Sequence, residues 1–293
     1  MPSARVGDIH IEYEDLGPKH GRPLLLVMGL GAQMILWEDD LCAELIERGH
    51  RVIRFDNRDV GRSTRLVRAG MPDMARAAEA FFAGQPVDAP YTLSDMAGDA
   101  AGLLDALEIP AAHVVGASLG GMIAQTLAIE RPRRVRSLVS IMSTTGRPEL
   151  PPARPEAMAV LLLPTPNDRD AYVERSLHVF RTIGSPGFPF EEDRVRRLAL
   201  RSWERGISPD GPARQLLAVI ASGSRHERLA ALRVPTLVLH GADDPLMPVE
   251  HARDTATCIP GAELLVIEGM GHDLPRPVWP RLVDAISQLT TRS

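Results

Sequence analysis

A serine between glycines, in the segment HVVGASLGGM at residues 113–122, is the residue of this sequence best suited to act as a nucleophile. Gly-x-Ser-x-Gly is typical of a nucleophile elbow, where the serine stands on a sharp turn between a strand and a helix. The pattern is also expected by chance in about one chain in ten of this length, because roughly 7% of residues are glycine. The alternative is a tight turn with an inert serine. Ser118 is therefore predicted to be a nucleophile only if its chemical partners occur elsewhere in the chain.

A serine hydroxyl is a weak nucleophile near neutral pH and needs a base that takes its proton. His272, in VIEGMGHDLP at residues 266–275, follows the last apolar run and stands in a glycine-flanked loop. The histidines at positions 113, 240 and 251 fall within predicted strands or a predicted helix, where packing or solvation accounts for them. We therefore predict that His272 is the base.

The base in turn needs a carboxylate that orients it, and this acid is expected between the serine and the histidine in the chain. LHGADDPLMP, at residues 239–248, offers Asp243 and Asp244 directly after a predicted strand. Asp244 is preferred because Pro245 restricts the backbone of the turn that follows it. Asp243 is the alternative acid, and otherwise a solvated or capping carboxylate.

Backbone amides are the expected donors to the oxyanion that forms when a serine attacks a carbonyl group. The amide of Leu119 follows the serine at the start of a predicted helix, where the helix dipole favours negative charge. The glycine-containing segment VMGLGA, at residues 27–32, follows the first long apolar strand and makes the amide of Leu30 the second candidate donor. The alternative for this segment is an ordinary turn after a strand.

The elements that must position these residues alternate between strands and helices. Residues 4–16 predict an antiparallel hairpin around Gly7. Further strands are predicted at 23–29, 51–56, 112–118, 135–143, 235–241 and 262–269, and helices at 39–50, 93–107, 120–131, 250–259 and 279–290. Thr92 and Asp95 predict a capping box at the start of the helix over 93–107. This alternation predicts a mostly parallel central sheet with helices on both faces.

The alternation breaks between residues 146 and 227, where proline-rich stretches join helical patterns such as RDAYVERSLHVFRTI. Because the sheet resumes directly afterwards, we predict a helical cap (146–227) inserted into a core formed by 1–145 and 228–293. A second domain of unrelated function is the alternative. Five methionines near the predicted strand ends could line an adaptable apolar pocket or simply fill the core: Met28, Met34, Met122, Met142 and Met270.

The composition is that of an ordinary protein of 293 residues with a net charge of −5, which argues against a nucleic-acid partner. The two cysteines, Cys42 and Cys258, are too few for a disulfide framework. We see neither a signal-peptide pattern at the N-terminus nor the ~18 consecutive apolar residues of a membrane span. A cytoplasmic chain without a membrane partner is expected. The choice between monomer and homodimer stays open.

With Ser118, Asp244 and His272, and with the segments VMGLGA and RFDNRDVGRST (54–64), the chain resembles the α/β-hydrolase superfamily over nearly its whole length. The second segment is similar to the Asp-x-Arg-Gly-x-Gly-x-Ser motif of capped members. Asp59 stands where glycine is usual, and Met28 where the oxyanion loop commonly has histidine. These departures, together with GMGHDLP, are similar to the aclacinomycin methylesterase group, which hydrolyses a methyl ester on a polyketide glycoside.

The resemblance implies an α/β-hydrolase fold and a serine carboxylic-ester hydrolase that acts through Ser118, Asp244 and His272. The substrate would be an apolar small-molecule ester, with a methyl ester as one candidate, and no metal or cofactor would be needed. The alternatives are a lactonase or a cofactor-free perhydrolase that uses the same three residues. A receptor that kept the fold without catalysis is a further alternative.

Overall fold

The structure, a computed structural model, describes residues 2–293, and these form an eight-stranded sheet with strand order β1-β2-β4-β3-β5-β6-β7-β8. The strands are β1 (Ser3–Val6), β2 (Ile9–Leu16), β3 (Arg22–Val27), β4 (His50–Phe55), β5 (Ala112–Ala117), β6 (Val135–Ile141), β7 (Thr236–Gly241) and β8 (Glu263–Ile267). β1 pairs with β2 and β2 with β4 in antiparallel fashion, whereas the ladders from β4 to β8 are parallel. The predicted hairpin and the mostly parallel sheet are both confirmed.

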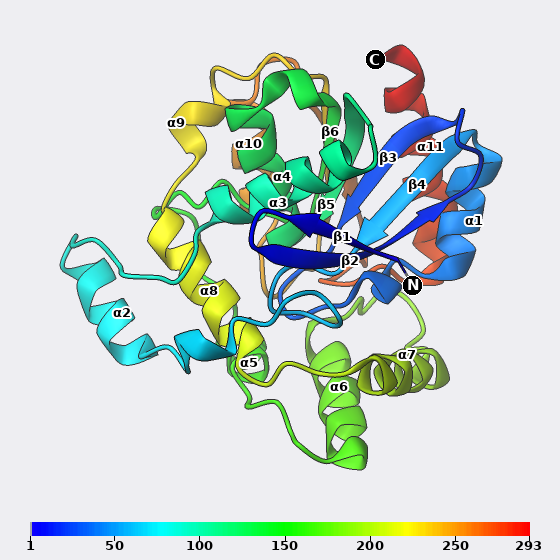
Figure 1. Cartoon of the computed structure of the whole chain (residues 1–293). Helices are drawn as coiled ribbons and strands as arrows, with labels where there is room; N and C mark the ends of the chain where they lie inside the picture. Colours follow the sequence, from blue (N-terminus) through cyan, green and yellow to red (C-terminus); the bar gives the residue numbers. More distant parts are fainter. Residues whose placement is uncertain (1) are drawn as a thin grey trace.

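Helices cover both faces of the sheet, as predicted (Figure 1). The helices are α1 (Asp39–Glu47), α2 (Met74–Phe82), α3 (Leu93–Ala106), α4 (Leu119–Glu130), α5 (Pro155–Leu161), α6 (Arg169–Ile183), α7 (Glu192–Arg205), α8 (Gly211–Ser222), α9 (His226–Leu229), α10 (Glu250–Cys258) and α11 (Trp279–Arg292). Short 3-10 helices are η1 (Met34–Leu36), η2 (Val67–Ala69), η3 (Pro132–Arg134) and η4 (Arg276–Val278). One hydrophobic cluster joins the sheet to α3 and α4, and another joins it to α1 and α11.

The central strands explain why the apolar runs of the sequence are continuous. Every residue of β5 and of β7 is buried, because helices cover both sides of these strands. At the start of α3, Thr92 and Asp95 form the predicted capping box, which satisfies amides that have no partner within the helix. Local sequence signals and tertiary packing therefore agree in this part of the chain.

Between β6 and β7, α6 and α7 lie apart from the helices that flank the sheet, whereas α9 lies beside α10 (Figure 1). We call residues 146–227 the helical segment. All its residues are described, and none of them lies in a strand. α6 and α7 pack against each other through Val173, Leu177, Val195 and Ala199. α9 begins at His226 and so crosses the boundary expected at residue 227.

α2 is a helix that the sequence analysis did not predict. Its sequence, MARAAEAFF, is rich in alanine, and Asp73 caps its first turn by accepting a hydrogen bond from the amide of Arg76 at 3.0 Å. Helix propensity and the capping residue were therefore available signals. α2 packs against α8, beyond the edge of the sheet (Figure 1). Among residues 2–293, no helix has both the length and the apolar character needed to cross a membrane.

Candidate active site

Ser118 lies on the turn between β5 and α4 with φ 54° and ψ −121°, a backbone conformation that non-glycine residues rarely adopt. The glycines on either side permit this turn. A Cβ on Gly116 would lie 2.1 Å from the carbonyl oxygen of Gly120, and a Cβ on Gly120 would lie 2.1 Å from the carbonyl oxygen of Val27. The turn is thus the strained strand-to-helix connection that a nucleophile elbow requires.

The side chains of Ser118, His272 and Asp244 form one continuous chain of hydrogen bonds. His272 Nε2 lies 2.9 Å from Ser118 Oγ, and His272 Nδ1 lies 2.7 Å from Asp244 Oδ2. An ionised carboxylate only accepts hydrogen bonds, so Nδ1 carries the imidazole proton. Nε2 is then the acceptor for the serine hydroxyl. The structure therefore brings together the nucleophile, base and acid predicted from the sequence.

Asp244 is held by backbone donors as well as by His272. Its Oδ1 accepts hydrogen bonds from the amides of Leu246 and Met247, both at 2.8 Å, and the residue is 3% exposed. Burial by itself raises the pKa of this carboxyl group. The adjacent His272 and the hydrogen bonds outweigh burial and lower the pKa of Asp244 below its ordinary value. Asp244 is consequently ionised near neutral pH.

Asp243, the alternative acid, occupies a different environment. Its Oδ2 accepts a hydrogen bond from the amide of Gly269 at 2.9 Å, in the turn that follows β8. The carboxylate therefore stabilises the loop that leads to His272, and it is Asp244 that lies beside the imidazole.

A second histidine near the acid was not among the predicted site residues. His240, at the end of β7, is fully buried, and its Nε2 lies 2.7 Å from the carbonyl oxygen of Met247 and 3.6 Å from Asp244 Oδ2. Burial lowers the pKa of His240, so the ring is neutral near pH 7. His240 thus supports the turn that holds Asp244. Its place four residues before the acid was the only sequence signal.

The two predicted oxyanion donors come from two different elements beside the serine. Leu119 is the first residue of α4, and Leu30 lies in the loop after β3. A Cβ on Gly29 would lie only 3.2 Å from the Cβ of Ser118, so the loop runs directly against the serine. Within the described residues 2–293, neither the Leu30 nor the Leu119 amide makes a hydrogen bond. Both amides can therefore receive a bound oxygen atom.

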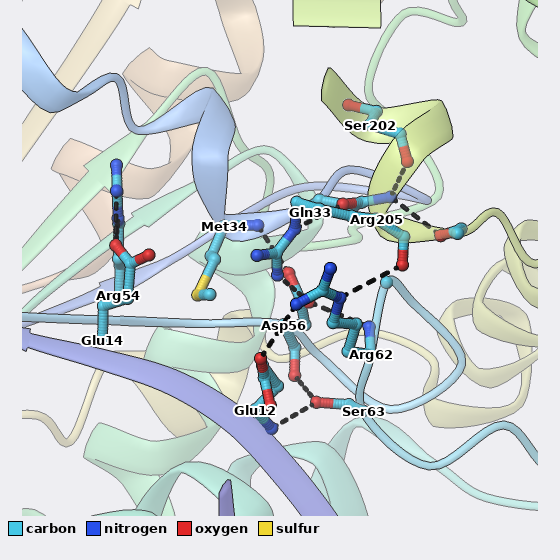
Figure 2. Close-up of polar contacts among 12 residues, drawn as sticks. Glu12, Glu14, Gln33, Met34, Arg54, Asp56, Arg62, Ser63, Ser202 and Arg205 are labelled. Atoms are coloured by element: carbon cyan, nitrogen blue, oxygen red, sulfur yellow. Dashed lines mark hydrogen bonds and ion pairs between the residues drawn. The ribbon is translucent and has the colours of Figure 1, made fainter. Parts of the chain in front are cut away.

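The two aspartates of the RFDNRDVGRST segment pair with arginines of the helical segment. Asp59 has φ 66°, which explains why glycine is usual at this position, and aspartate is among the residues that tolerate this region. Its carboxylate accepts two hydrogen bonds from Arg214, at 2.7 and 2.9 Å. Asp56 pairs with Arg205 at 2.6 Å (Figure 2). The departure from glycine at Asp59 thus adds a second buried ion pair between core and helical segment.

A cavity of about 530 Å³ is lined by Ser118 and His272, and its wall combines residues of the helical segment with residues from the rest of the chain. Such a volume falls within the usual range for small-molecule sites, ~300–1,000 Å³. The lining is mainly apolar and includes Met28, Met122, Met142, Leu161, Val179, Phe180, Ile183 and Leu216. Two of the five methionines considered above, Met34 and Met270, are instead fully buried in the core.

Polar groups at the cavity wall include two that the sequence analysis did not assign to the site. His251 of α10 bonds to Thr144 Oγ1 at 2.7 Å and to the carbonyl oxygen of Pro151 at 2.9 Å. Asp273 follows the base directly, and burial raises the pKa of its carboxyl group. The position of Asp273 beside His272 was visible in the sequence, whereas that of His251 depends on how α10 packs.

Comparison with known proteins identifies the class to which this fold and site belong. Residues 22–275 match the family described as the alpha/beta hydrolase fold. The structure matches that of an enol-lactonase from Burkholderia xenovorans with a TM-score of 0.74 at 21% identity, covering 99% of this chain and 100% of that one. The chain therefore belongs to the α/β-hydrolase family, as the sequence motifs predicted.

Relatives with named activities place the chain among the hydrolytic enzymes. It is 32% identical to the rhodomycin D methylesterase of Streptomyces peucetius, over 98% of this chain and 97% of that protein. It is 31% identical to the poly(3-hydroxyalkanoate) depolymerase of Ectopseudomonas oleovorans, over 87% of this chain and 80% of that protein. The chain is a hydrolase, and its resemblance to methylesterases is confirmed.

Proposed function

We propose that the protein is a serine carboxylic-ester hydrolase that works through a covalent acyl-enzyme. The observation that carries this proposal is the continuous hydrogen-bonded chain from Ser118 Oγ through His272 to Asp244, with distances of 2.9 and 2.7 Å. This arrangement supplies a nucleophile, a general base and a group that orients the base. It opens into the cavity between core and helical segment.

The reaction has two steps. Ser118 Oγ attacks the ester carbonyl carbon while His272 Nε2 takes the hydroxyl proton, and the amides of Leu30 and Leu119 stabilise the oxyanion. The tetrahedral intermediate collapses when the bond to the alcohol oxygen breaks and His272 returns the proton to the leaving alcohol. Water, deprotonated by His272, then attacks the acyl carbon. The bond from that carbon to Ser118 Oγ breaks, His272 returns the proton to Oγ, and the carboxylic acid is released.

We further propose that residues 146–227 act as a cap over a core formed by 1–145 and 228–293. The cavity supports this division, because its wall combines core residues such as Met28 and Met142 with helical-segment residues such as Val179 and Phe180. In this arrangement the core supplies the chemistry and the cap supplies much of the surface that selects the substrate.

The proposed substrate is an apolar small-molecule ester, and a methyl ester is the first candidate to test. The size and apolar lining of the cavity suit a bulky acyl group. The name of the rhodomycin D methylesterase relative supports a small alcohol as leaving group. Methionines at the wall, with flexible thioether side chains, suit an adaptable pocket.

The test of the proposed function combines labelling with turnover. We expect a fluorophosphonate probe to label Ser118 and the protein to release p-nitrophenol from acyl esters. Ser118→Ala should abolish labelling and lower kcat by about 10⁶, the loss seen when the serine of a protease triad is removed. A folded wild-type protein that neither labels nor hydrolyses esters would contradict the proposal. A panel of lactones, run beside the esters, separates esterase from lactonase.

A further inference from the structure

The loop that carries Leu30 depends on contacts from outside itself. In residues 28–34, the amide of Ala32 donates to the carbonyl oxygen of Gly29 at 3.2 Å, which closes a turn around Leu30 and Gly31. Gly31 has φ 63°, a region that glycine adopts without strain. Glycines also make a loop conformationally free. The geometry of this loop must therefore come from the groups packed around it.

Gln215 of α8 provides the contact nearest to Leu30. Its Oε1 accepts a hydrogen bond from the amide of Gly31 at 2.8 Å, and its Nε2 donates to the carbonyl oxygen of Arg58 at 2.9 Å. These partners determine the orientation of the side-chain amide, because a backbone N–H only donates and a carbonyl only accepts. Gln215 is fully buried. It therefore holds the Gly31 amide towards α8 and leaves the Leu30 amide without a protein partner among residues 2–293.

A second contact from α8 lies against the same turn. A Cβ on Gly31 would lie 2.8 Å from Cγ of Pro212, so the first turn of α8 packs directly on the loop. α8 itself is anchored to the core because Arg214, the neighbour of Gln215, pairs with Asp59 at 2.7 Å. Gln215, which accepts the hydrogen bond from the Gly31 amide, thus lies on a helix that the Arg214–Asp59 ion pair holds in place.

The far end of the loop is held by a buried network that involves α7 (Figure 2). Asp56 accepts a hydrogen bond from the amide of Met34 at 2.8 Å and pairs with Arg205 at 2.6 Å. Arg205 Nε donates to Gln33 Oε1 at 2.8 Å, and Gln33 Nε2 donates to the carbonyl oxygen of Ser202 at 2.8 Å. The middle of the loop, at Gly31, and its C-terminal end, at Gln33, are therefore bound to the helical segment.

We propose that Gln215 is a positioning residue for the oxyanion site, an inference that rests on the esterase function proposed above. It holds the Leu30–Gly31 peptide so that the Leu30 amide faces the substrate oxygen before the reaction begins. Oxyanion donors stabilise the transition state only when they are oriented in advance, and the loss of one donor costs roughly 10²–10³ in kcat. A donor that is present but displaced should lower kcat by a smaller factor than the loss of that donor does.

The first experiment compares Gln215→Met with Ser222→Ala. Methionine keeps the length of the side chain but cannot accept from Gly31 as an amide does, and we expect kcat to fall about 10- to 100-fold while KM changes less than about threefold. Ser222 lies on the same helix and donates to the carbonyl oxygen of Ala218, while its Oγ accepts from the amide of Leu93, away from the loop. Ser222→Ala should keep the wild-type kcat.

A transition-state analogue adds a measurement that a general structural defect would not reproduce. A trifluoromethyl ketone forms a tetrahedral adduct with an active serine and places an oxyanion in the site. For Gln215→Met, its inhibition constant should rise by about the factor by which kcat/KM falls. The affinity for the product acid, which resembles no transition state, should stay near the wild-type value.

Gln215→Glu is the conservative variant, because its protonated carboxyl group keeps an oxygen that can accept from the amide of Gly31 and an O–H that can donate to the carbonyl oxygen of Arg58. We expect it to recover most of the kcat lost in Gln215→Met. If the glutamate variant folds and loses as much kcat as the methionine variant, the contact with Gly31 is not responsible and the inference is overturned. A folded Gln215→Met protein with kcat within twofold of wild type overturns it as well.

Amide hydrogen exchange in the wild type keeps the two proposals distinguishable. The Gly31 amide should be protected from exchange and the Leu30 amide should not. If the wild type hydrolyses no ester but shows this protection, the proposed function fails while the contact between Gln215 and the loop stands. If Gly31 exchanges as fast as Leu30, the positioning role is overturned whatever the activity.

Discussion

Ser118 illustrates how a short motif combines chemistry with backbone requirements. Its φ of 54° lies in a region whose strain is of the order of 1–3 kcal/mol, and the fold must offset this strain by packing around the turn. Gly116 and Gly120 are required by close backbone contacts rather than by any reaction. Among the side chains of the motif, only that of Ser118, 2.9 Å from His272 Nε2, has a place in the proposed chemistry.

At the scale of single residues, the choice between the two neighbouring aspartates can be tested directly. Asp244→Asn removes the carboxylate that fixes the tautomer of His272, and we expect kcat to fall by about 10⁴, as for the equivalent change in a protease triad. Asp243→Asn is the matched control. It retains an oxygen that can accept from Gly269 and should keep kcat within about threefold of wild type, because no transition-state group is altered. A larger loss from Asp243→Asn than from Asp244→Asn would reverse the assignment.

Two helices of the helical segment are joined to the core by buried ion pairs. Asp56 and Asp59, which follow β4, pair with Arg205 of α7 and Arg214 of α8, and all four side chains are at most 7% exposed. A buried pair is weak evidence for stability by itself, because both charges lose hydration. Removing one partner is costly, however, since the other charge stays buried. These pairs therefore determine where α7 and α8 sit on the core.

At the scale of elements, we expect Arg205→Met to lower the free energy of unfolding by about 3–5 kcal/mol, because the Asp56 carboxylate is left without its guanidinium partner. Urea unfolding provides the measurement. Arg196→Met is the control, since Arg196 is 40% exposed and pairs with Glu174 and Glu192 at the surface. The free energy of unfolding of Arg196→Met should stay close to the wild-type value, because exposed ion pairs contribute little. Equal effects of the two substitutions would refute the structural role of the buried pair.

The whole molecule contains several histidines that burial keeps neutral. Burial lowers the pKa of His50 and His240, and it lowers that of His113, in β5, to about 4. The unfolded chain takes up protons on these side chains as the pH falls below ~6.5, and the folded chain does not. The contribution of these neutral histidines to the free energy of unfolding is therefore fully present above pH ~6.5, and it decreases as the pH falls towards 4.

At this scale, we expect the free energy of unfolding to fall between pH 6.5 and pH 4, measured by urea unfolding at a series of pH values. His113→Gln removes one of the buried imidazoles. The unfolded chain then takes up nearly one proton fewer than the wild type does, so the free energy of unfolding should change less steeply with pH. His20→Gln, at an exposed position, is the control and should keep the wild-type slope. A wild-type slope of zero over this range would contradict the prediction.

Much of the fold follows from local patterns in the sequence. The apolar runs predicted the strands from β3 to β8, and the helical pattern RDAYVERSLHVFRTI coincides with α6, Arg169–Ile183. α2 was not predicted from hydrophobic periodicity, and among the side chains that the structure describes in this alanine-rich helix only Ala77 is buried. Ser118, Asp244 and His272 were also predicted, because the order nucleophile, acid, base is a property of the chain itself.

The sequence by itself determined the residues available for chemistry and the elements that carry them, because both depend on residue type and near-neighbour spacing. Only the tertiary structure decided which distant groups meet. Gln215 lies 184 residues beyond Gly31, and their contact arises because α8 packs on the loop after β3. The pairing of Asp59 with Arg214 and the shape of the cavity have the same origin. Such contacts depend on how whole elements pack against each other, and no local pattern encodes them.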